Sequence, residues 1–294
     1  MRPVLPAMLL VLSAVVRADG VLVLQSDFGM KDGAVAAMKG VATSVSADLV
    51  IHDLTHEIPA YNIWEAALRL DQVVEYWPQG TVFVSVVDPG VGTDRKSVVL
   101  KTGTGHYFVT PDNGTLTFVA EKLGIAAVRE IDEAVNRRKN TEMSYTFHGR
   151  DVYAYTGARL AAGVIRFEEV GGELPASVVA IPYQHAVFED DSLRGNIPIL
   201  DVQYGNVWTN IDRDTFDKLG LSHGDLVRVV IREDDRVVFD ESVPYVATFG
   251  EVPVGEPLVY LNSLNNVALA LNQGDFAGDH GIRSGPAWEI GITR

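Results

Sequence analysis

Residues 81–95 read TVFVSVVDPGVGTDR, and this stretch decides how the rest of the sequence is interpreted. The apolar run from Thr81 to Val87 predicts a buried strand, which stops at the carboxylate of Asp88. A loop with one proline and two glycines follows and ends at Arg95. In open α/β sheets ligands bind outside the carboxyl ends of the strands, so Asp88 and Arg95 are predicted to lie at a ligand site. The alternative is an ordinary turn closed by a surface ion pair.

The sequence before this stretch alternates between strand and helix patterns. Residues 21–25 and 49–53 are short apolar runs, whereas residues 34–40 and 63–75 repeat apolar side chains at helical spacing. Asn62 is a predicted N-cap of the second helix. Strands that are apolar throughout and alternate with helices predict a parallel sheet covered by helices.

The last hundred residues have a different texture. Short alternating strands with frequent turns are predicted at 197–202, 206–211, 226–231, 236–240, 258–261 and 288–292. The predicted fold is therefore an α/β N-terminal domain with a mainly parallel sheet (20–189), plus a smaller all-β, barrel-like C-terminal domain (190–294).

Composition narrows the classes of function. The 294 residues carry a net charge of −15, which argues against nucleic-acid binding, because that needs a basic surface. Cysteine is absent, which excludes disulfides, thiolate catalysis and cysteine-ligated metals. The seven histidines show no metal-binding spacing, so no metal site is predicted. Phosphate-binding and dinucleotide-binding glycine motifs and a serine nucleophile elbow are also absent.

The N-terminus resembles a secretory signal. Arg2 supplies a positive charge, residues 4–16 are mostly apolar, and Ala18 ends a plausible cleavage site. Residues 1–18 are therefore predicted to be a signal peptide, which places the mature protein in the periplasm or outside the cell. The apolar run is short for a transmembrane helix, so no membrane attachment is expected after cleavage. The alternative is an unprocessed tail on a cytoplasmic protein.

Three polar residues of the N-terminal half suggest water chemistry. His148 lies in the sequence FHGRD, just before a predicted helix, and Asp88 and Arg95 close the loop described above. A cation beside a water molecule favours its hydroxide form, and the other two groups can orient that water. Asp27 and Asp53 also follow predicted strands and are candidates for holding ribose hydroxyls. The alternative for His148 is a structural role at the start of a helix.

Two stretches of the C-terminal half mix aromatic rings with amide side chains. They are DVQYGNVWTN at 201–210 and YLNSLNN at 260–266. Such a composition suits a ligand with a flat ring and polar edges, such as adenine. The alternative is a pair of hairpin turns with core aromatics.

Six motifs in this order resemble one family. They are SDFG (26–29), DPGVGTDR (88–95), PDNG (111–114), FHGRD (147–151), DVQYGNVWTN (201–210) and YLNS (260–263). Together they make residues 20–294 similar to the S-adenosyl-L-methionine (SAM) hydroxide adenosyltransferases, which are SAM hydrolases related to fluorinase and chlorinase.

The resemblance implies a reaction and an assembly. SAM would be hydrolysed to adenosine and L-methionine by attack of an activated water or hydroxide on the ribose 5′ carbon, without a cofactor. The protein would form a homotrimer, with SAM bound between the N-terminal domain of one subunit and the C-terminal domain of its neighbour.

The resemblance also implies roles for single residues. Asp88, Arg95 and His148 match the family's water-activating set, and Asp27 matches the carboxylate that holds the ribose hydroxyls. Contacts to the ribose, the methionine part and the adenine ring would come from Tyr61, Asp201, Tyr204, Asn206 and Ser263.

The chain departs from the halogenases at several positions, and two alternatives to hydrolysis are kept beside it. The halogenases carry tyrosine at the position of Asp88, and fluorinase has an insertion where this chain has the short turn 103–105. Leu271 stands where fluorinase places an arginine near adenine. The alternatives are an exported adenosine- or nucleoside-binding protein and a halide-dependent SAM adenosyltransferase.

Overall fold

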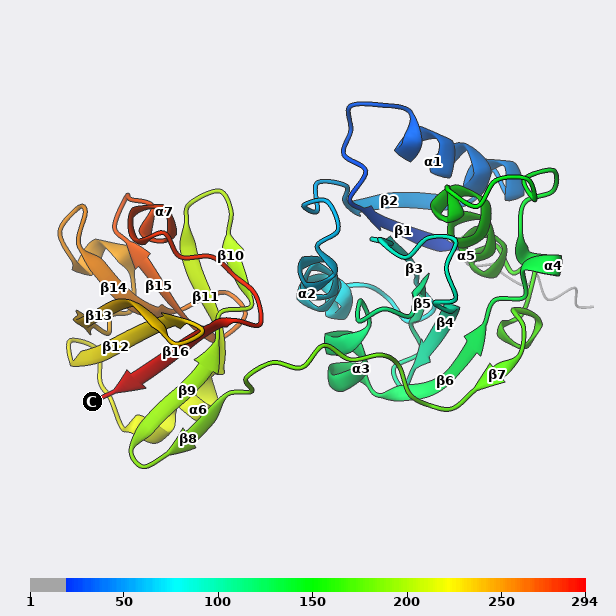
Figure 1. The fold of residues 1–294 in the computed structure, drawn as a ribbon. Coiled ribbons are helices and arrows are strands. Elements are labelled where there is room, and N and C mark those ends of the chain that lie inside the picture. The colour runs from blue at the N-terminus through cyan, green and yellow to red at the C-terminus, as the bar shows by residue number, and fades with distance from the viewer. Residues whose placement is uncertain (1–19) are drawn as a thin grey trace, which may run out of the picture.

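The computed structural model describes residues 20–294, so the predicted signal peptide lies outside the described residues. Figure 1 shows two domains, a helix-covered N-terminal domain and a C-terminal domain of sheets, joined by an extended linker. Among residues 20–294, no helix has the length and apolar character needed to cross a membrane.

The N-terminal domain is built on one seven-stranded sheet with the order β2-β1-β3-β5-β4-β6-β7. Five strands run in one direction, whereas β4 and β7 run the opposite way. The prediction of a mainly parallel sheet is thus confirmed, with two exceptions. Residues 103–106 join β4 to β5, and a parallel crossover needs about a dozen residues or more, so these neighbours must pair as a hairpin. The strands are β1 (Val21–Ser26), β2 (Val50–Thr55), β3 (Val82–Val86), β4 (Ser97–Thr102), β5 (Tyr107–Pro111), β6 (Ile125–Glu130) and β7 (Glu173–Leu174).

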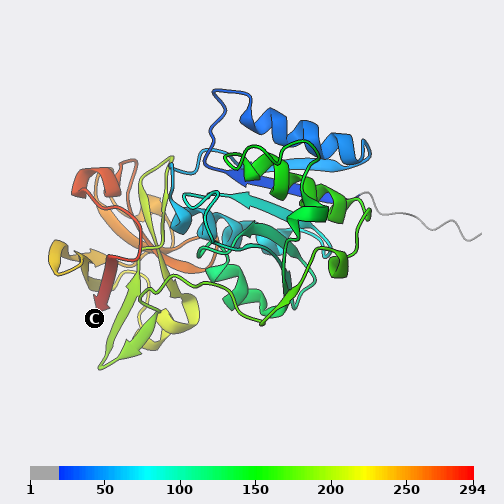
Figure 2. The same ribbon diagram turned by 45° about the vertical axis from the view of Figure 1, so that its right-hand side comes forward.

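Helices cover both faces of this sheet, as Figures 1 and 2 show. One apolar core joins the sheet to α1 and α5, and a second joins its other face to α2 and α3. The side chain of Asn62 accepts a hydrogen bond from the Glu65 N–H at 3.0 Å, so it caps α2 as predicted. The helices are α1 (Ala34–Val45), α2 (Ile63–Val73), α3 (Thr117–Leu123), α4 (Glu133–Asn136) and α5 (Tyr155–Ala161), with a π-helical turn (Gly149–Ala154) leading into α5.

The C-terminal domain contains two antiparallel sheets, with the orders β10-β11-β15-β14 and β13-β12-β16-β9-β8. Their facing sides enclose one apolar core, and in the described residues they do not close into a single barrel. The all-β prediction is confirmed. The strands are β8 (Val187–Glu189), β9 (Ser192–Asn196), β10 (Ile199–Asp201), β11 (Asn206–Asp212), β12 (Leu226–Glu233), β13 (Arg236–Pro244), β14 (Pro257–Leu261), β15 (Asn266–Leu271) and β16 (Trp288–Thr293), with the short helices α6 (Arg213–Phe216) and α7 (Phe276–His280).

The two domains touch through an apolar contact beside the linker. Trp64 and Phe118, from α2 and α3, pack with Ile199 of β10, and the indole N–H of Trp64 donates to the carbonyl of Pro198 at 2.8 Å. The strands β8 and β9 form a hairpin, so the predicted division at residue 190 falls within its turn. The first strand of the C-terminal sheets therefore begins at Val187.

Candidate active site

The sheet topology brings Asp88 and Arg95 to the same edge. Asp88 follows the end of β3, and Arg95 precedes the start of β4. Because β4 runs against β5, its first residue, Ser97, pairs with Pro111 at the end of β5, and β5 is parallel to β3. The chain leaves the sheet at Asp88, passes the end of β5 and returns at Arg95. This explains why the six residues between Asp88 and Arg95 suffice to bring the two side chains together.

One guanidinium connects the three predicted water-activating residues. Nε of Arg95 donates to Oδ1 of Asp88 at 2.9 Å, and its Nη2 donates to Oδ2 at 2.5 Å. The same Nη2 lies 2.9 Å from Nδ1 of His148. Only 12% of the Arg95 side chain and 6% of the Asp88 side chain are exposed, so the bidentate pair is shielded from water. The structure thus places the three side chains in contact, while their roles stay predictions.

Glycine at position 149 lets His148 approach the strand ends. A Cβ atom on Gly149 would lie 3.0 Å from Cζ of Phe28 and 3.0 Å from Cγ1 of Val86. A larger residue would push the π-helical turn away from β1 and β3. The glycine that follows His148 in the sequence FHGRD is therefore needed for close packing.

Two further residues of this cluster were missed in the sequence. Nη1 of Arg95 donates to the hydroxyl of Ser97 at 3.0 Å, and the same hydroxyl lies 3.0 Å from the phenol oxygen of Tyr153. The Tyr153 hydroxyl also points to Asp88 at 3.4 Å. Burial and then the charge of Asp88 raise the pKa of Tyr153, so the phenol remains a proton donor. Tyr153 follows His148 by five residues, which is the spacing of a π-helical turn and too rare to assume from sequence.

A second arginine approaches His148 from the other side of the ring. Nη1 of Arg137 lies 3.4 Å from Nε2 of His148 and 2.6 Å from the carboxylate of Glu133. Its guanidinium also stacks on the ring of Tyr145, 4.6 Å from the centroid. Arg137 lies in a polar stretch without a recognisable motif, so its approach to His148 could not be predicted from sequence.

His148 is therefore held in its neutral form. Burial lowers its pKa, and the charges of Arg95 and Arg137 lower it further, against the opposing charges of Glu133 and Asp88. A neutral imidazole can accept the hydrogen bond from Arg95, whereas an imidazolium cannot.

Replacing Arg137 with methionine is expected to raise the pKa of His148. The change removes one of the two cations and leaves Glu133 unopposed, and both effects favour protonation. His148 starts from a pKa below its usual 6.5, so the acid limb of the kcat/KM profile should lie below that pH and move upward in the variant. The measurement is the pH dependence of kcat/KM. Arg138→Met, which changes an exposed arginine one residue away, should leave the limb in place. An unmoved limb in Arg137→Met would contradict the interpretation.

Asp27 and Tyr61 form a second contact near the same edge. Asp27 follows β1, and its Oδ2 accepts a hydrogen bond from the Tyr61 N–H at 2.9 Å. The backbone of Tyr61 has a φ of +68°, and 72% of the residue is exposed. The structure therefore places an exposed ring beside Asp27, while the ligand roles of both residues stay predictions.

Two of the four predicted residues of the C-terminal domain line a different cavity. Tyr204 and Asn206 line a cavity of 650 Å³, together with Phe249, Leu271 and Asp275 among others. Asn206 donates from Nδ2 to the carboxylate of Asp201 at 3.2 Å. Ser263 lies exposed in the turn between β14 and β15 and is absent from the lining of this cavity.

Within one chain the two groups of residues remain apart. Over residues 20–294, no hydrogen bond, ion pair or ring contact joins Asp27, Tyr61, Asp88, Arg95 or His148 to Asp201, Tyr204, Asn206 or Ser263. Arg95 and His148 line a separate cavity of 310 Å³. For these two sets of predicted residues we use two names: the N-terminal half-site is the set Asp27, Tyr61, Asp88, Arg95 and His148, and the C-terminal half-site is the set Asp201, Tyr204, Asn206 and Ser263.

Two family models together span both domains. Residues 22–171 match the SAM hydroxide adenosyltransferase N-terminal domain, and residues 195–289 match the SAM hydroxide adenosyltransferase C-terminal domain. The chain belongs to the SAM hydroxide adenosyltransferase family.

Relatives of this SAM hydroxide adenosyltransferase chain carry two kinds of name. The "(R)-S-adenosyl-L-methionine hydrolase" of Methanocaldococcus jannaschii is 36% identical over 74% of this chain and 75% of its own length. The protein of that name from Salinispora tropica is 35% identical over 88% of this chain and 93% of its own. A "Fluorinase" of Actinopolyspora mzabensis is 30% identical over 93% and 97%. The crystal structure of an uncharacterized conserved protein from Thermotoga maritima is 37% identical and has a TM-score of 0.83, covering 93% of this chain and all of that one.

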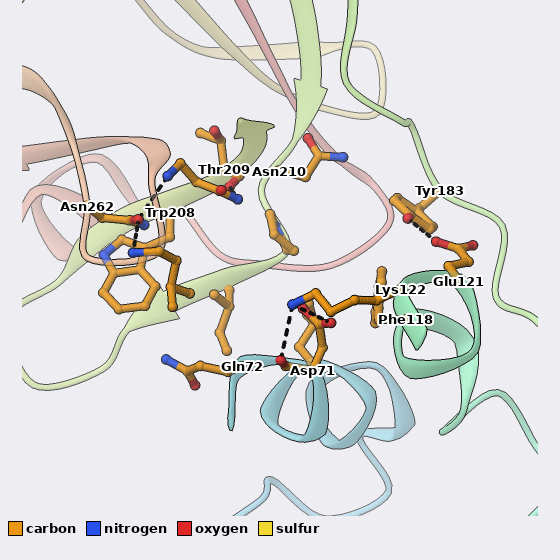
Figure 3. Close-up of a pocket in the computed structure, with 15 residues that line it drawn as sticks. Asp71, Gln72, Phe118, Glu121, Lys122, Tyr183, Trp208, Thr209, Asn210 and Asn262 are labelled. Atoms are coloured by element: carbon orange, nitrogen blue, oxygen red, sulfur yellow. Dashed lines mark hydrogen bonds and ion pairs between the residues drawn. The ribbon is translucent and has the colours of Figure 1, made fainter. Parts of the chain in front are cut away.

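The contact between the two domains of this family member encloses a cavity of its own. Figure 3 shows Asp71 paired with Lys122, and Glu121 bonded to Tyr183, opposite Trp208 and Asn262. The cavity measures 360 Å³, and none of the nine predicted site residues lines it. The two half-sites therefore do not meet at the interdomain contact of a single chain. In the described part of the chain, no group of three histidine, aspartate or glutamate side chains is placed to hold a metal ion.

Proposed function

We propose that this protein hydrolyses SAM to adenosine and L-methionine by attack of water on the ribose 5′ carbon. The observation that carries the proposal is the shielded Asp88–Arg95–His148 cluster at the carboxyl edge of the parallel strands. Family membership and the relatives named SAM hydrolases support the same reaction.

The chemistry asks little of the protein beyond orientation. The sulfonium of SAM is an excellent leaving group, so methionine departs without an acid and without a cofactor. The protein must align a water molecule with the 5′ carbon and the sulfur, and such positioning can supply about 7–11 kcal/mol of the barrier. Asp88 has carboxylate lone pairs left to accept from that water, and the charge of Arg95 favours its hydroxide form.

Hydrolysis in ¹⁸O-labelled water tests the bond that forms. We expect adenosine to carry the label on its 5′ oxygen and methionine to carry none, because the water oxygen attacks carbon and the C–S bond breaks. Both sulfur epimers of SAM are assayed, since the hydrolase relatives are named for the (R) form. Label in any other product would contradict the proposal.

The same assay separates the alternatives. A fluorinase relative makes a halide-dependent adenosyltransferase the second hypothesis. Added chloride or fluoride would then yield a 5′-halogenated adenosine at the expense of adenosine. A nucleoside-binding protein would bind adenosine and form no product. The carboxylate of Asp88 favours water over a halide in this position, because water can donate a hydrogen bond to a carboxylate oxygen and a halide cannot.

Replacing Asp27 with asparagine is expected to weaken adenosine binding about tenfold or more. The carboxylate accepts the Tyr61 N–H with one oxygen, and it retains acceptor capacity for the ribose diol. An amide offers one acceptor fewer and no charge. Calorimetric titration with adenosine measures the effect, and Asp32→Asn, an exposed carboxylate five residues away, is the matched control. Equal affinities in Asp27→Asn and the wild type would exclude the ribose role.

We further propose a homotrimer in which each N-terminal half-site faces the C-terminal half-site of a neighbouring subunit. The separation of the half-sites within one chain supports this arrangement, since SAM needs both.

We also propose that residues 1–18 direct export and are then removed, which mass spectrometry of the mature protein tests. Export would place the enzyme where SAM arrives only after leaving the cytoplasm.

A further inference from the structure

A buried Ser–His–Asp chain lies beside the N-terminal half-site. The hydroxyl of Ser26 is 2.7 Å from Nδ1 of His56, and Nε2 of His56 is 3.1 Å from Oδ1 of Asp53. Lys39 completes the chain with an ion pair of 2.6 Å to the other oxygen of Asp53. Ser26 and His56 are buried, with exposures of 0% and 3%. We define Ser26, His56 and Asp53 as the buried relay.

The charge of Asp53 sets one hydrogen bond of the buried relay. Burial raises the pKa of Asp53, but the hydrogen bonds from Lys39 and His56 outweigh it and the pKa is lowered, so Asp53 is an ionised acceptor. Nε2 of His56 therefore donates to Asp53, and Nδ1 is paired with the hydroxyl of Ser26, which can donate or accept.

The buried relay is not a nucleophilic triad. In serine hydrolases the histidine faces serine with Nε2 and aspartate with Nδ1, whereas here the two ring nitrogens are exchanged. The Ser26 hydroxyl is also inaccessible, and it accepts a further hydrogen bond from the Phe28 N–H at 3.3 Å. No substrate carbon can reach it.

The buried relay instead braces the loop that carries Asp27. Ser26 and Phe28 flank Asp27, and the hydrogen bond between them holds the turn in which the carboxylate sits. On the opposite side, the carbonyl of His56 accepts the Gly29 N–H at 2.7 Å. His56 therefore fastens both ends of the Asp27 turn to the loop that leads to Tyr61, whose N–H in turn binds Asp27.

We propose that His56 is a positioning residue for substrate, which acts by holding Asp27 in the orientation that receives the ribose hydroxyls. The inference rests on the proposed function, since it takes Asp27 as the ribose-binding carboxylate. Its consequence is specific: loosening the relay weakens ribose binding, and it does so only while Asp27 is present.

A double-mutant cycle on the full-length chain tests this inference, with adenosine as the calorimetric probe and SAM as the substrate. In His56→Asn the shorter amide places a polar group near the former position of Nδ1, where it can still bond to Ser26, but it cannot reach Asp53. We expect about tenfold weaker adenosine binding, a matching rise in KM, and a kcat at saturation that stays within about threefold, because the water-activating cluster is separate. In the Asp27→Asn background the same change should cost less than about twofold, because an effect that acts through Asp27 is not additive with the loss of Asp27.

The controls separate a positioning role from a structural one. His52→Asn changes an exposed histidine on β2 whose ring touches Trp77, and it should bind adenosine like the wild type. If His56→Asn does not fold, Ser26→Ala, which removes one hydroxyl, should show the same dependence on Asp27. Equal losses with and without Asp27 would overturn the inference. Failure of the wild type itself to hydrolyse SAM would overturn the proposed function instead.

Discussion

Replacing Asp88 with asparagine is expected to lower the kcat of SAM hydrolysis about a thousandfold while KM changes only a few-fold. The amide keeps the shape of the side chain and one acceptor for Arg95 but removes the charge that orients and polarises water. General-base and orienting groups contribute about 10²- to 10⁴-fold to rate, so the loss should fall in that range. A substitution that disturbs the attacking water but not the contacts to the substrate lowers kcat and leaves KM almost unchanged.

Steady-state kinetics and adenosine titration together check this expectation. Asp94→Asn is the matched control, because Asp94 lies exposed in the same loop. Asp88→Asn leaves the buried charge of the Arg95 guanidinium without its counter-charge, which can destabilise the fold. Thermal unfolding must therefore be measured together with activity. His148→Ala, which leaves the Asp88–Arg95 pair intact, should also lose turnover more than binding. If both variants bound SAM poorly but turned over normally at saturation, the assigned roles would be wrong.

The sequence predicted the contact between Asp88 and Arg95 because the information is local. An apolar strand that ends in a carboxylate, followed by a glycine-rich loop, locates a sheet edge without knowledge of strand order. The direction of β4 follows from an equally local feature, the short turn at residues 103–106.

Other parts of the site depend on information that single stretches do not carry. Tyr153 reaches both Ser97 and Asp88 because the helix after His148 opens with a π-helical turn. The buried relay joins residues 26 and 56 through the pairing of β1 with β2. Strand register and helix type decide these contacts, and neither has a motif.

Ser263 shows the limit of transferring roles along a sequence. Its motif matches the family pattern, yet the side chain lies in an exposed turn and outside the cavity that Tyr204 and Asn206 line. In the proposed homotrimer, a neighbouring subunit would have to face this turn for Ser263 to contact SAM. The same holds for the exposed rings of Tyr61 and Tyr204.

Mixing two inactive variants is expected to restore activity if the half-sites meet across subunits. Asp88→Ala damages the N-terminal half-site and Asp201→Ala damages the C-terminal half-site, so each trimer made of one variant should be dead. When equal amounts are unfolded and refolded together, a site is intact only if its N-terminal half comes from Asp201→Ala and its C-terminal half from Asp88→Ala. Random assembly around a cyclic, head-to-tail interface gives that combination in about a quarter of the sites.

The recovered activity, measured against wild type refolded in the same way, distinguishes the two arrangements. A quarter of the wild-type rate can arise only where SAM lies between subunits, because a site closed within one chain always contains one damaged half. Light scattering must confirm that mixed trimers form, and each parent refolded alone sets the background. Mixed trimers as inactive as their parents would exclude the shared site. The cavities around Arg95 and around Tyr204 would then have to close on each other by a movement of the linker at residues 175–186.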